Sequence, residues 1–254
     1  MTKKNTFQFS NCAIDDPELF ANKKEDFLEK VNSFVDKSLL NSAEEPREYL
    51  GASLLGNKCA RCIQFTFLGA TPDKPDTGQQ KRIFEMGHVL ENVMAQWLRN
   101  AGFELETRDE SGQQFGFTQA DGRIQGHVDG IIRSGPLDLK YPILWECKTM
   151  KSAVWRDLVK DKLEIANSQY FAQIQLYMAY MKLPQCLFAS LNKDTAELYH
   201  ELILLNTATA AQYSDRAVQI LKATESNEFL PRIATKSDWY ECKMCRFYNT
   251  CWGD

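Results

Sequence analysis

Four cysteines are the side chains of this sequence best suited to binding a soft metal. Cys59 stands early in the chain, and Cys242, Cys245 and Cys251 form a C-x2-C-x5-C cluster near its end. Four thiolates suit a [4Fe–4S] cluster or a tetrahedral Zn²⁺ ion. The spacing therefore predicts a four-cysteine metal site that joins the N- and C-terminal parts of the chain.

Two acidic residues and a lysine form a second candidate site, midway along the chain. Asp129 lies in the segment GHVDG, and Glu146, Cys147 and Lys148 lie in the segment WECK. Carboxylates and a backbone carbonyl, here that of Cys147, are hard donors that suit Mg²⁺ or Mn²⁺. Lys148 would orient or help deprotonate an attacking water and offset charge on a phosphate. A solvated Glu and Lys on an outer strand face are the alternative, but the apolar run before Glu146 favours a buried site.

These residues meet only if strands position them. Residues 123–132 and 143–149 have strand patterns, and a Ser-Gly-Pro bend would join them as a hairpin. Side chains alternate along a strand, so His127 and Asp129 would share one face of a continuous first strand. Neighbouring strands lie about 4.8 Å apart, which would bring Asp129 and Glu146 to one cation.

Helical and strand patterns fill most of the remaining chain. Helical spacing of apolar residues occurs over residues 24–40, 81–100, 151–163, 168–182 and 207–224. Strand patterns occur over residues 103–107, 114–119, 187–191 and 197–205. Ser53 is expected to cap a segment that runs to Leu68, and residues 69–80 form an expected loop. The order predicts one mixed α/β domain over residues 1–254, with a helical extension (1–50) and a cysteine-rich tail (240–254).

The bulk composition is that of a soluble globular protein. The chain has 254 residues, of which 44% are hydrophobic and 25% are charged. No apolar stretch of about 18 residues predicts a membrane span, and no apolar segment follows the N-terminal lysines as in a secretory signal. We therefore expect a cytoplasmic protein, whose thiols stay reduced and available to metals. The net charge of −4 argues against a polybasic nucleic-acid coat but leaves a nuclease open.

The central motif resembles that of a known superfamily. GHVDG followed by LWECK is similar to the D…ExK core of the PD-(D/E)XK nucleases, within the branch of the RecB nuclease domain, lambda exonuclease and the iron–sulfur exonucleases of CRISPR adaptation. The cysteine arrangement, with Cys59-Ala60-Arg61, resembles the AddB-type and CRISPR-adaptation members. The resemblance covers residues 53–254. It implies a restriction-endonuclease-like core, a mixed central β-sheet flanked by helices.

The resemblance also implies roles for residues outside the central motif. Gln173 and Tyr177 match a Q-x3-Y motif and share a helical face; they would contact DNA phosphate or position the catalytic lysine. A core tyrosine with a solvated glutamine neighbour is the alternative. An early helix of this branch carries a further metal ligand, for which G-x3-E spacing favours Glu91 and the RecB-like pattern favours His88.

The remaining cysteines leave one alternative open. Cys59 and Cys62 could form a zinc site with two tail cysteines, whereas the resemblance favours Cys59 alone and an iron–sulfur cluster. We expect Cys62 and the thiols of Cys12, Cys147 and Cys186 to serve in packing. A clasp between distant ends of the chain would stabilise the fold by restricting the unfolded chain.

Together these patterns predict a Mg²⁺- or Mn²⁺-dependent deoxyribonuclease. We expect an exonuclease that acts on DNA ends or single strands in recombination, repair or the processing of phage or foreign DNA. A catalytically silent iron–sulfur or zinc protein that binds DNA is the alternative, and a redox iron–sulfur protein would leave the central motif unexplained. The sequence leaves open a homo-oligomer or a recombination partner protein.

Overall fold

The computed structural model of the protein describes residues 17–41 and 47–253. The chain divides into two units, residues 1–44 with 76–83 and residues 45–75 with 84–254. Helix α1 (Pro17–Leu40) belongs to the first unit, and most of its described apolar side chains are exposed. The expected single domain over 1–254 stays a prediction, and Cys12 lies outside the described residues.

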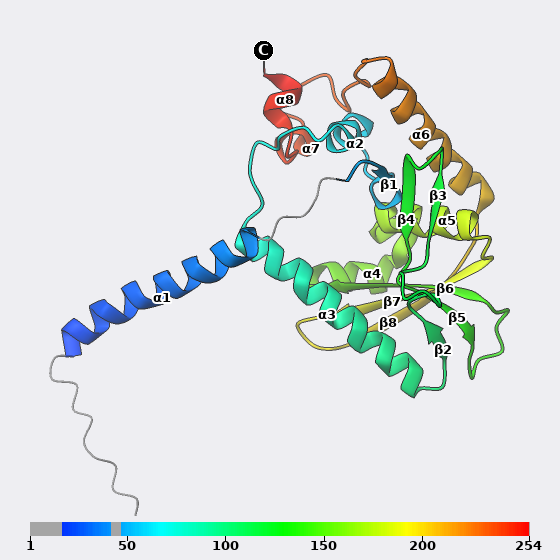
Figure 1. The fold of residues 1–254 in the computed structure, drawn as a ribbon, viewed down its shortest axis with the longest axis horizontal. Coiled ribbons are helices and arrows are strands. Elements are labelled where there is room, and N and C mark those ends of the chain that lie inside the picture. The colour runs from blue at the N-terminus through cyan, green and yellow to red at the C-terminus, as the bar shows by residue number, and fades with distance from the viewer. Residues whose placement is uncertain (1–16, 42–46, 254) are drawn as a thin grey trace, which may run out of the picture. The chain divides into compact units, whose positions relative to one another are not determined.

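Two sheets organise the second unit (Figure 1). The larger has the order β2-β5-β6-β7-β8, with β2 Glu104–Glu106, β5 Gly130–Ser134, β6 Ile143–Met150, β7 Gln185–Asn192 and β8 Leu198–Leu204. Only its β6–β7 pair is parallel. The smaller has the order β1-β4-β3, with β1 Leu50–Gly51, β4 Ile124–His127 and β3 Gly116–Gln119. The expected mixed sheet is therefore confirmed.

The first strand of the expected hairpin is broken, so the prediction of one strand over residues 123–132 is wrong. Strand β4 ends at His127, β5 begins at Gly130, and the two lie in different sheets. The chain crosses over at the fully buried Val128, whose backbone N–H donates to the carbonyl of Phe115 (2.9 Å). His127 is exposed and does not share a strand face with Asp129.

Helices α3 Gly78–Asn100, α4 Ser152–Ala166 and α5 Ser168–Met181 flank the larger sheet as expected. The other helices of the second unit are α2 Ala60–Phe67, α6 Thr207–Glu225, α7 Tyr240–Lys243 and α8 Tyr248–Trp252, with the 3-10 turn η1 Ala52–Leu54. Ser53 lies inside η1 and caps no helix; Cys59 is the N-cap of α2. Helix α3 begins inside the expected loop because Thr77 and Gln80 form reciprocal capping bonds. Among the described helices, none combines the length and apolar character needed to cross a bilayer.

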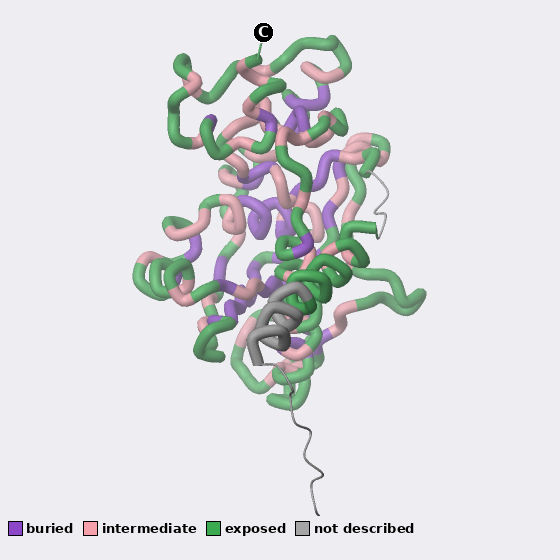
Figure 2. The backbone as a smooth tube through the Cα atoms, turned by 90° about the vertical axis from the view of Figure 1, so that its left-hand side faces the viewer, coloured by how far each residue is buried: buried purple, intermediate pink, exposed green. Residues whose placement is uncertain are grey.

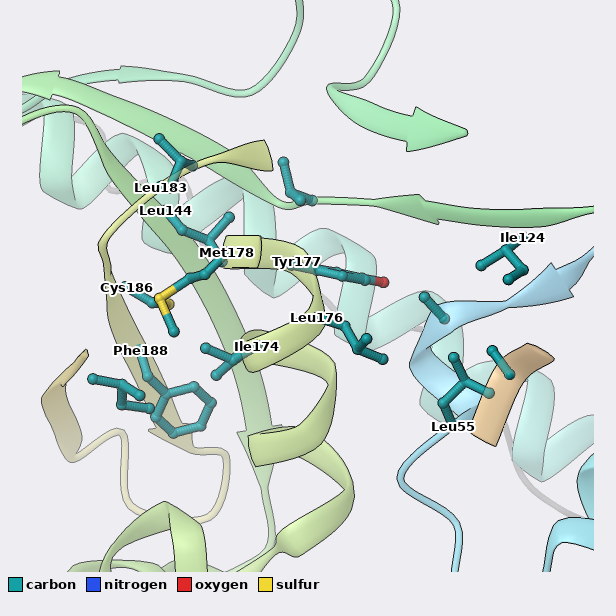
Figure 3. Close-up of a cluster of buried hydrophobic side chains, with 14 of the residues drawn as sticks. Leu55, Ile124, Leu144, Ile174, Leu176, Tyr177, Met178, Leu183, Cys186 and Phe188 are labelled. Carbon is teal, nitrogen blue, oxygen red and sulfur yellow. The ribbon is translucent and has the colours of Figure 1, made fainter. Parts of the chain in front are cut away.

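Alternate residues of β6 face two separate cores. Leu144 packs with Ile174 and Met178 of α5 and with Phe188 of β7 (Figure 3). Trp145 packs on the other face, with residues of α3 such as Met94. Figure 2 marks the buried residues in purple. This alternation places Glu146 and Lys148 on the α5 face of the sheet, inside the fold.

Candidate active site

Glu146 is the centre of the site. The residue is fully buried in β6. Its Oε1 atom accepts hydrogen bonds from Lys148 Nζ (2.5 Å) and from Gln173 Nε2 (2.6 Å). Its Oε2 atom has no hydrogen-bond partner in the described part of the chain. A buried carboxylate oxygen without a partner is costly, and a bound cation would remove that cost.

Asp129 lies beside Glu146 at the start of β5. Strand β5 pairs with β6 so that Gly130 faces Trp145. The Oδ2 atom of Asp129 accepts a hydrogen bond from the Cys147 backbone N–H (2.9 Å) and lies 3.8 Å from Lys148 Nζ. The hairpin predicted from the sequence thus brings Asp129, Glu146 and Lys148 together.

Burial and charge oppose each other in this cluster. Burial, and then the charge of Asp129, raise the pKa of the Glu146 carboxyl above its usual range. Burial disfavours the charge of Lys148, but the carboxylates of Glu146 and Asp129 outweigh it and raise the lysine pKa. A divalent cation would relieve the repulsion between the two carboxylates, so their surroundings fit a hard metal ion.

A third carboxylate, that of Glu91, belongs to the same electrostatic group. Glu91 is half-buried in α3, and burial followed by the charge of Asp129 raises its pKa to about 7. His88, one turn earlier on α3, is exposed. The structure therefore brings Glu91 toward Asp129 and Lys148, whereas the side chain of His88 is exposed to solvent.

Gln173 and Tyr177 are both buried. Gln173 donates to the carboxylate oxygen of Glu146 that also accepts from Lys148, and it is not a solvated neighbour. The Tyr177 ring packs edge-on against Phe117 (centroids 5.6 Å apart) beneath Gly126. The motif glutamine therefore orients the buried carboxylate, while the tyrosine supports the wall of the site.

Gly126 of the GHVDG segment should tolerate no larger side chain. A Cβ atom there would lie 2.5 Å from Cζ of Phe117 and 2.8 Å from Cε1 of Tyr177. We expect Gly126→Ala to lower the free energy of unfolding by about 1–3 kcal/mol, as in other overpacked cores. Gly87→Ala is the matched control: a Cβ there meets nothing within 4 Å in α3, and we expect a gain of about 0.5–1 kcal/mol. Urea unfolding of both variants would show this, and equal effects would contradict it.

The pKa of Glu91 predicts a pH dependence of stability in metal-free protein. Because the folded-state pKa is raised to about 7, the folded state binds more protons than the unfolded state between the ordinary carboxyl pKa and that value. The free energy of unfolding should therefore fall as pH rises through this interval. Glu91→Gln removes the titrating group, so its curve of unfolding free energy against pH should be flatter than that of the parent. Parallel curves for the two proteins would contradict the assignment.

Five cysteines line one cavity of about 630 Å³. They are Cys59 and Cys62 from the start of α2, and Cys242, Cys245 and Cys251 from the tail. Burial, then the neighbouring Cys245, raise the pKa of Cys62 to about 12. Cys147 and Cys186 are buried apart from this cavity, in agreement with their expected packing role.

Direct contacts also join the region of α2 to the C-terminal tail, at this cavity and next to it. Lys58 Nζ lies 2.7 Å from Glu241 Oε1, and the Asn249 N–H donates to Asp73 (2.8 Å). Arg61 donates to Cys251 Sγ (3.9 Å). Across the described residues, however, no three His, Cys, Asp or Glu side chains are arranged so that they could hold a metal ion. Neither the four cysteines nor the carboxylates of Glu91, Asp129 and Glu146 therefore form a complete coordination site in this structure. The donor chemistry of the cavity nevertheless fits thiolate ligation, and that of the carboxylates fits a hard cation.

Tyr170 is a contact of the site that the sequence did not single out. Its ring centroid lies 5.4 Å from Lys148 Nζ. The only available signal was its position three residues before Gln173, which puts both near one helical face.

Two solved structures share this fold. LHK-Exo in complex with dAMP, an alkaline exonuclease from Laribacter hongkongensis, matches 70% of this chain and 89% of its own, with a TM-score of 0.50 and 17% identity. SSO0001 matches 85% of this chain and 94% of its own, with a TM-score of 0.50 and 18% identity. Neither a protein-family profile nor a curated protein sequence matches the chain. At these identities the similarity shows the fold alone.

Proposed function

We propose that the chain is a metal-dependent DNA nuclease of the PD-(D/E)XK type. More narrowly, we propose that it is an exonuclease. The observation that carries this proposal is the buried Glu146, which lies beside Asp129 and Lys148 and whose Oε2 atom accepts no hydrogen bond from the described residues. The fold shared with an alkaline exonuclease, whose structure holds a deoxynucleotide, supports it.

The carboxylates of Asp129, Glu146 and Glu91 and the carbonyl of Cys147 would hold Mg²⁺ or Mn²⁺, with His88 as the weaker candidate. Such an ion, when bound, supplies Lewis acidity toward the phosphate and lowers the pKa of a water. Gln173 holds the Glu146 carboxylate in place. Lys148 keeps a positive charge beside both acids, where it offsets charge that develops on phosphorus oxygens. Water adds to phosphorus and loses a proton to solvent as the bond to the leaving strand oxygen breaks, and that oxygen takes up a proton from solvent.

For the cysteine cavity we propose a [4Fe–4S] cluster held by Cys59, Cys242, Cys245 and Cys251, with Zn²⁺ as the alternative. Five cysteines around one cavity, at the junction of distant chain segments, support a thiolate-bound group with a structural role. Anaerobically purified protein should show broad visible absorbance and iron with acid-labile sulfide. Colourless protein with one equivalent of zinc would instead establish the alternative.

The decisive test of the nuclease function uses DNA labelled at the 5′ or 3′ end, single- or double-stranded, with Mg²⁺, Mn²⁺ or EDTA. Cleavage by the parent that needs the metal and disappears in both Asp129→Ala and Lys148→Ala supports the proposal. Binding of DNA without cleavage would replace it by a silent DNA-binding protein. The end label that is released first gives the direction, 5′ to 3′ or 3′ to 5′, in which the strand is degraded.

The setting of this activity is a further proposal. A DNA exonuclease of this type would act in the cytoplasm, in recombination, repair or the processing of phage or foreign DNA. A homo-oligomer or a recombination partner would hold it on its substrate. Light scattering of the purified chain, with and without DNA, tests the first of these assemblies.

A further inference from the structure

Tyr170 lies against the ammonium group of Lys148, and the proposed mechanism gives this contact no role. The distance of 5.4 Å from Nζ to the ring centroid is within the range at which an aromatic face attracts a cation. Tyr170 stands in the first turn of α5, and its N–H donates to the side chain of the N-cap Asn167 (3.0 Å). The cap fixes the start of the helix, and so it fixes the backbone that carries the ring.

Three groups therefore surround one ammonium group. Lys148 Nζ lies 2.5 Å from Glu146 Oε1 and 3.8 Å from Asp129 Oδ2, and the ring is the third partner. A lysine has a flexible four-carbon stem, and its charge attracts carboxylates from any angle. A ring attracts a cation only over its face, so the third contact adds a direction that the carboxylates do not supply.

An aromatic ring suits this position better than another carboxylate. A further negative charge would reduce the attraction of the site for a phosphate. The ring attracts the cation through its quadrupole and carries no net charge. The contact therefore holds Lys148 and leaves its positive charge available to DNA.

We propose that Tyr170 is a positioning residue that holds the Lys148 ammonium group in the orientation needed for cleavage. The proposal rests on the nuclease function proposed above. Because the ring and not the hydroxyl makes the contact, Tyr170→Phe should keep the parent kcat. Tyr170→Leu should lower kcat roughly 3- to 30-fold, the range expected for a partly desolvated cation–aromatic contact, with KM unchanged.

A fluorinated series tests the contact at nearly constant size. Phenylalanine analogues with increasing numbers of fluorine atoms, incorporated at position 170, progressively weaken the negative face of the ring. The value of kcat should fall in the order of fluorination. The same series at Phe103, a partly buried ring of the core on the α3 face of the sheet, should leave kcat unchanged. A constant kcat at position 170, or a rise in KM alone as expected for stacking on a base, would overturn the proposal.

A measurement without substrate separates this proposal from the nuclease function. In protein labelled with ¹³C at lysine Cε, the ring current of Tyr170 should shift the Lys148 signal, which is assigned by its loss in Lys148→Met. The shift should vanish in Tyr170→Leu. A parent that cleaves DNA but lacks the shift would overturn the role of Tyr170 and leave the nuclease standing. A parent that cleaves no DNA would overturn both, even with the shift present.

Discussion

Replacing Glu146 with glutamine is expected to lower the rate of metal-dependent DNA cleavage by about a thousandfold or more, equivalent to at least ~4 kcal/mol of transition-state stabilisation. Glutamine keeps the volume of the side chain but not its charge. It would replace one oxygen of a buried group that already binds Lys148 and Gln173. The affinity for Mn²⁺, measured by calorimetry, should fall together with the rate.

The same variant should not be less stable than the parent in metal-free buffer at pH 8. The raised pKa of Glu146 means that its charged form is unfavourable in the folded state, so stability falls as pH rises through that pKa. A neutral glutamine avoids this loss. Glu106→Gln is the matched control, because this half-exposed carboxylate of β2 pairs with Arg133 at the surface. It should leave the cleavage rate unchanged and change the free energy of unfolding by no more than about 1 kcal/mol. Full activity of Glu146→Gln would contradict the proposed site.

The sequence predicted the centre of the site because strand pairing is local. Asp129 directly precedes β5 and Glu146 lies in β6, its antiparallel neighbour, so their meeting depends on the turn between the two strands and on alternation along β6. The prediction from the same alternation that His127 and Asp129 share one strand face was wrong, because the chain passes from one sheet to the other at Val128. Nothing in a strand pattern marks such a crossing. It depends on the hydrogen bond between Val128 and Phe115, the residue that directly precedes β3 of the smaller sheet.

Contacts between segments that are far apart in the sequence could not be predicted from strand pairing and alternation. The hydrogen bond from Gln173 to Glu146 and the position of the Tyr170 ring depend on how α5 packs on β6. The choice between His88 and Glu91 likewise depends on the rotation of α3, because both residues occupy nearby positions on one helix. Periodicity predicted that these helices exist, but it does not fix the angle at which a helix presents one residue to a sheet.

Replacing Cys59 with serine is expected to lower the free energy of unfolding of the metal-loaded protein by about 3–5 kcal/mol, the scale of a cross-link that closes a long loop. Cys59 stands at the N-cap of α2, and its proposed partners lie in the C-terminal tail. A bound group would join these ends more strongly than the exposed Lys58–Glu241 pair, whose contribution is small. The metal content of Cys59→Ser should be lower than that of the parent, and urea unfolding should show the lower free energy of unfolding.

Cys62→Ser is the matched control, because this cysteine lies one turn later on the same helix and lines the same cavity. It should keep the metal content of the parent. Removing the metal by chelation should lower the stability of the parent by as much as Cys59→Ser does, and should lower that of Cys59→Ser no further, because both changes break the same link. If Cys62→Ser lost the metal while Cys59→Ser retained it, the ligand set would have to include Cys62 and exclude Cys59. If chelation changed the free energy of unfolding of neither the parent nor Cys59→Ser, the tail would be held by its hydrogen bonds and ion pair alone.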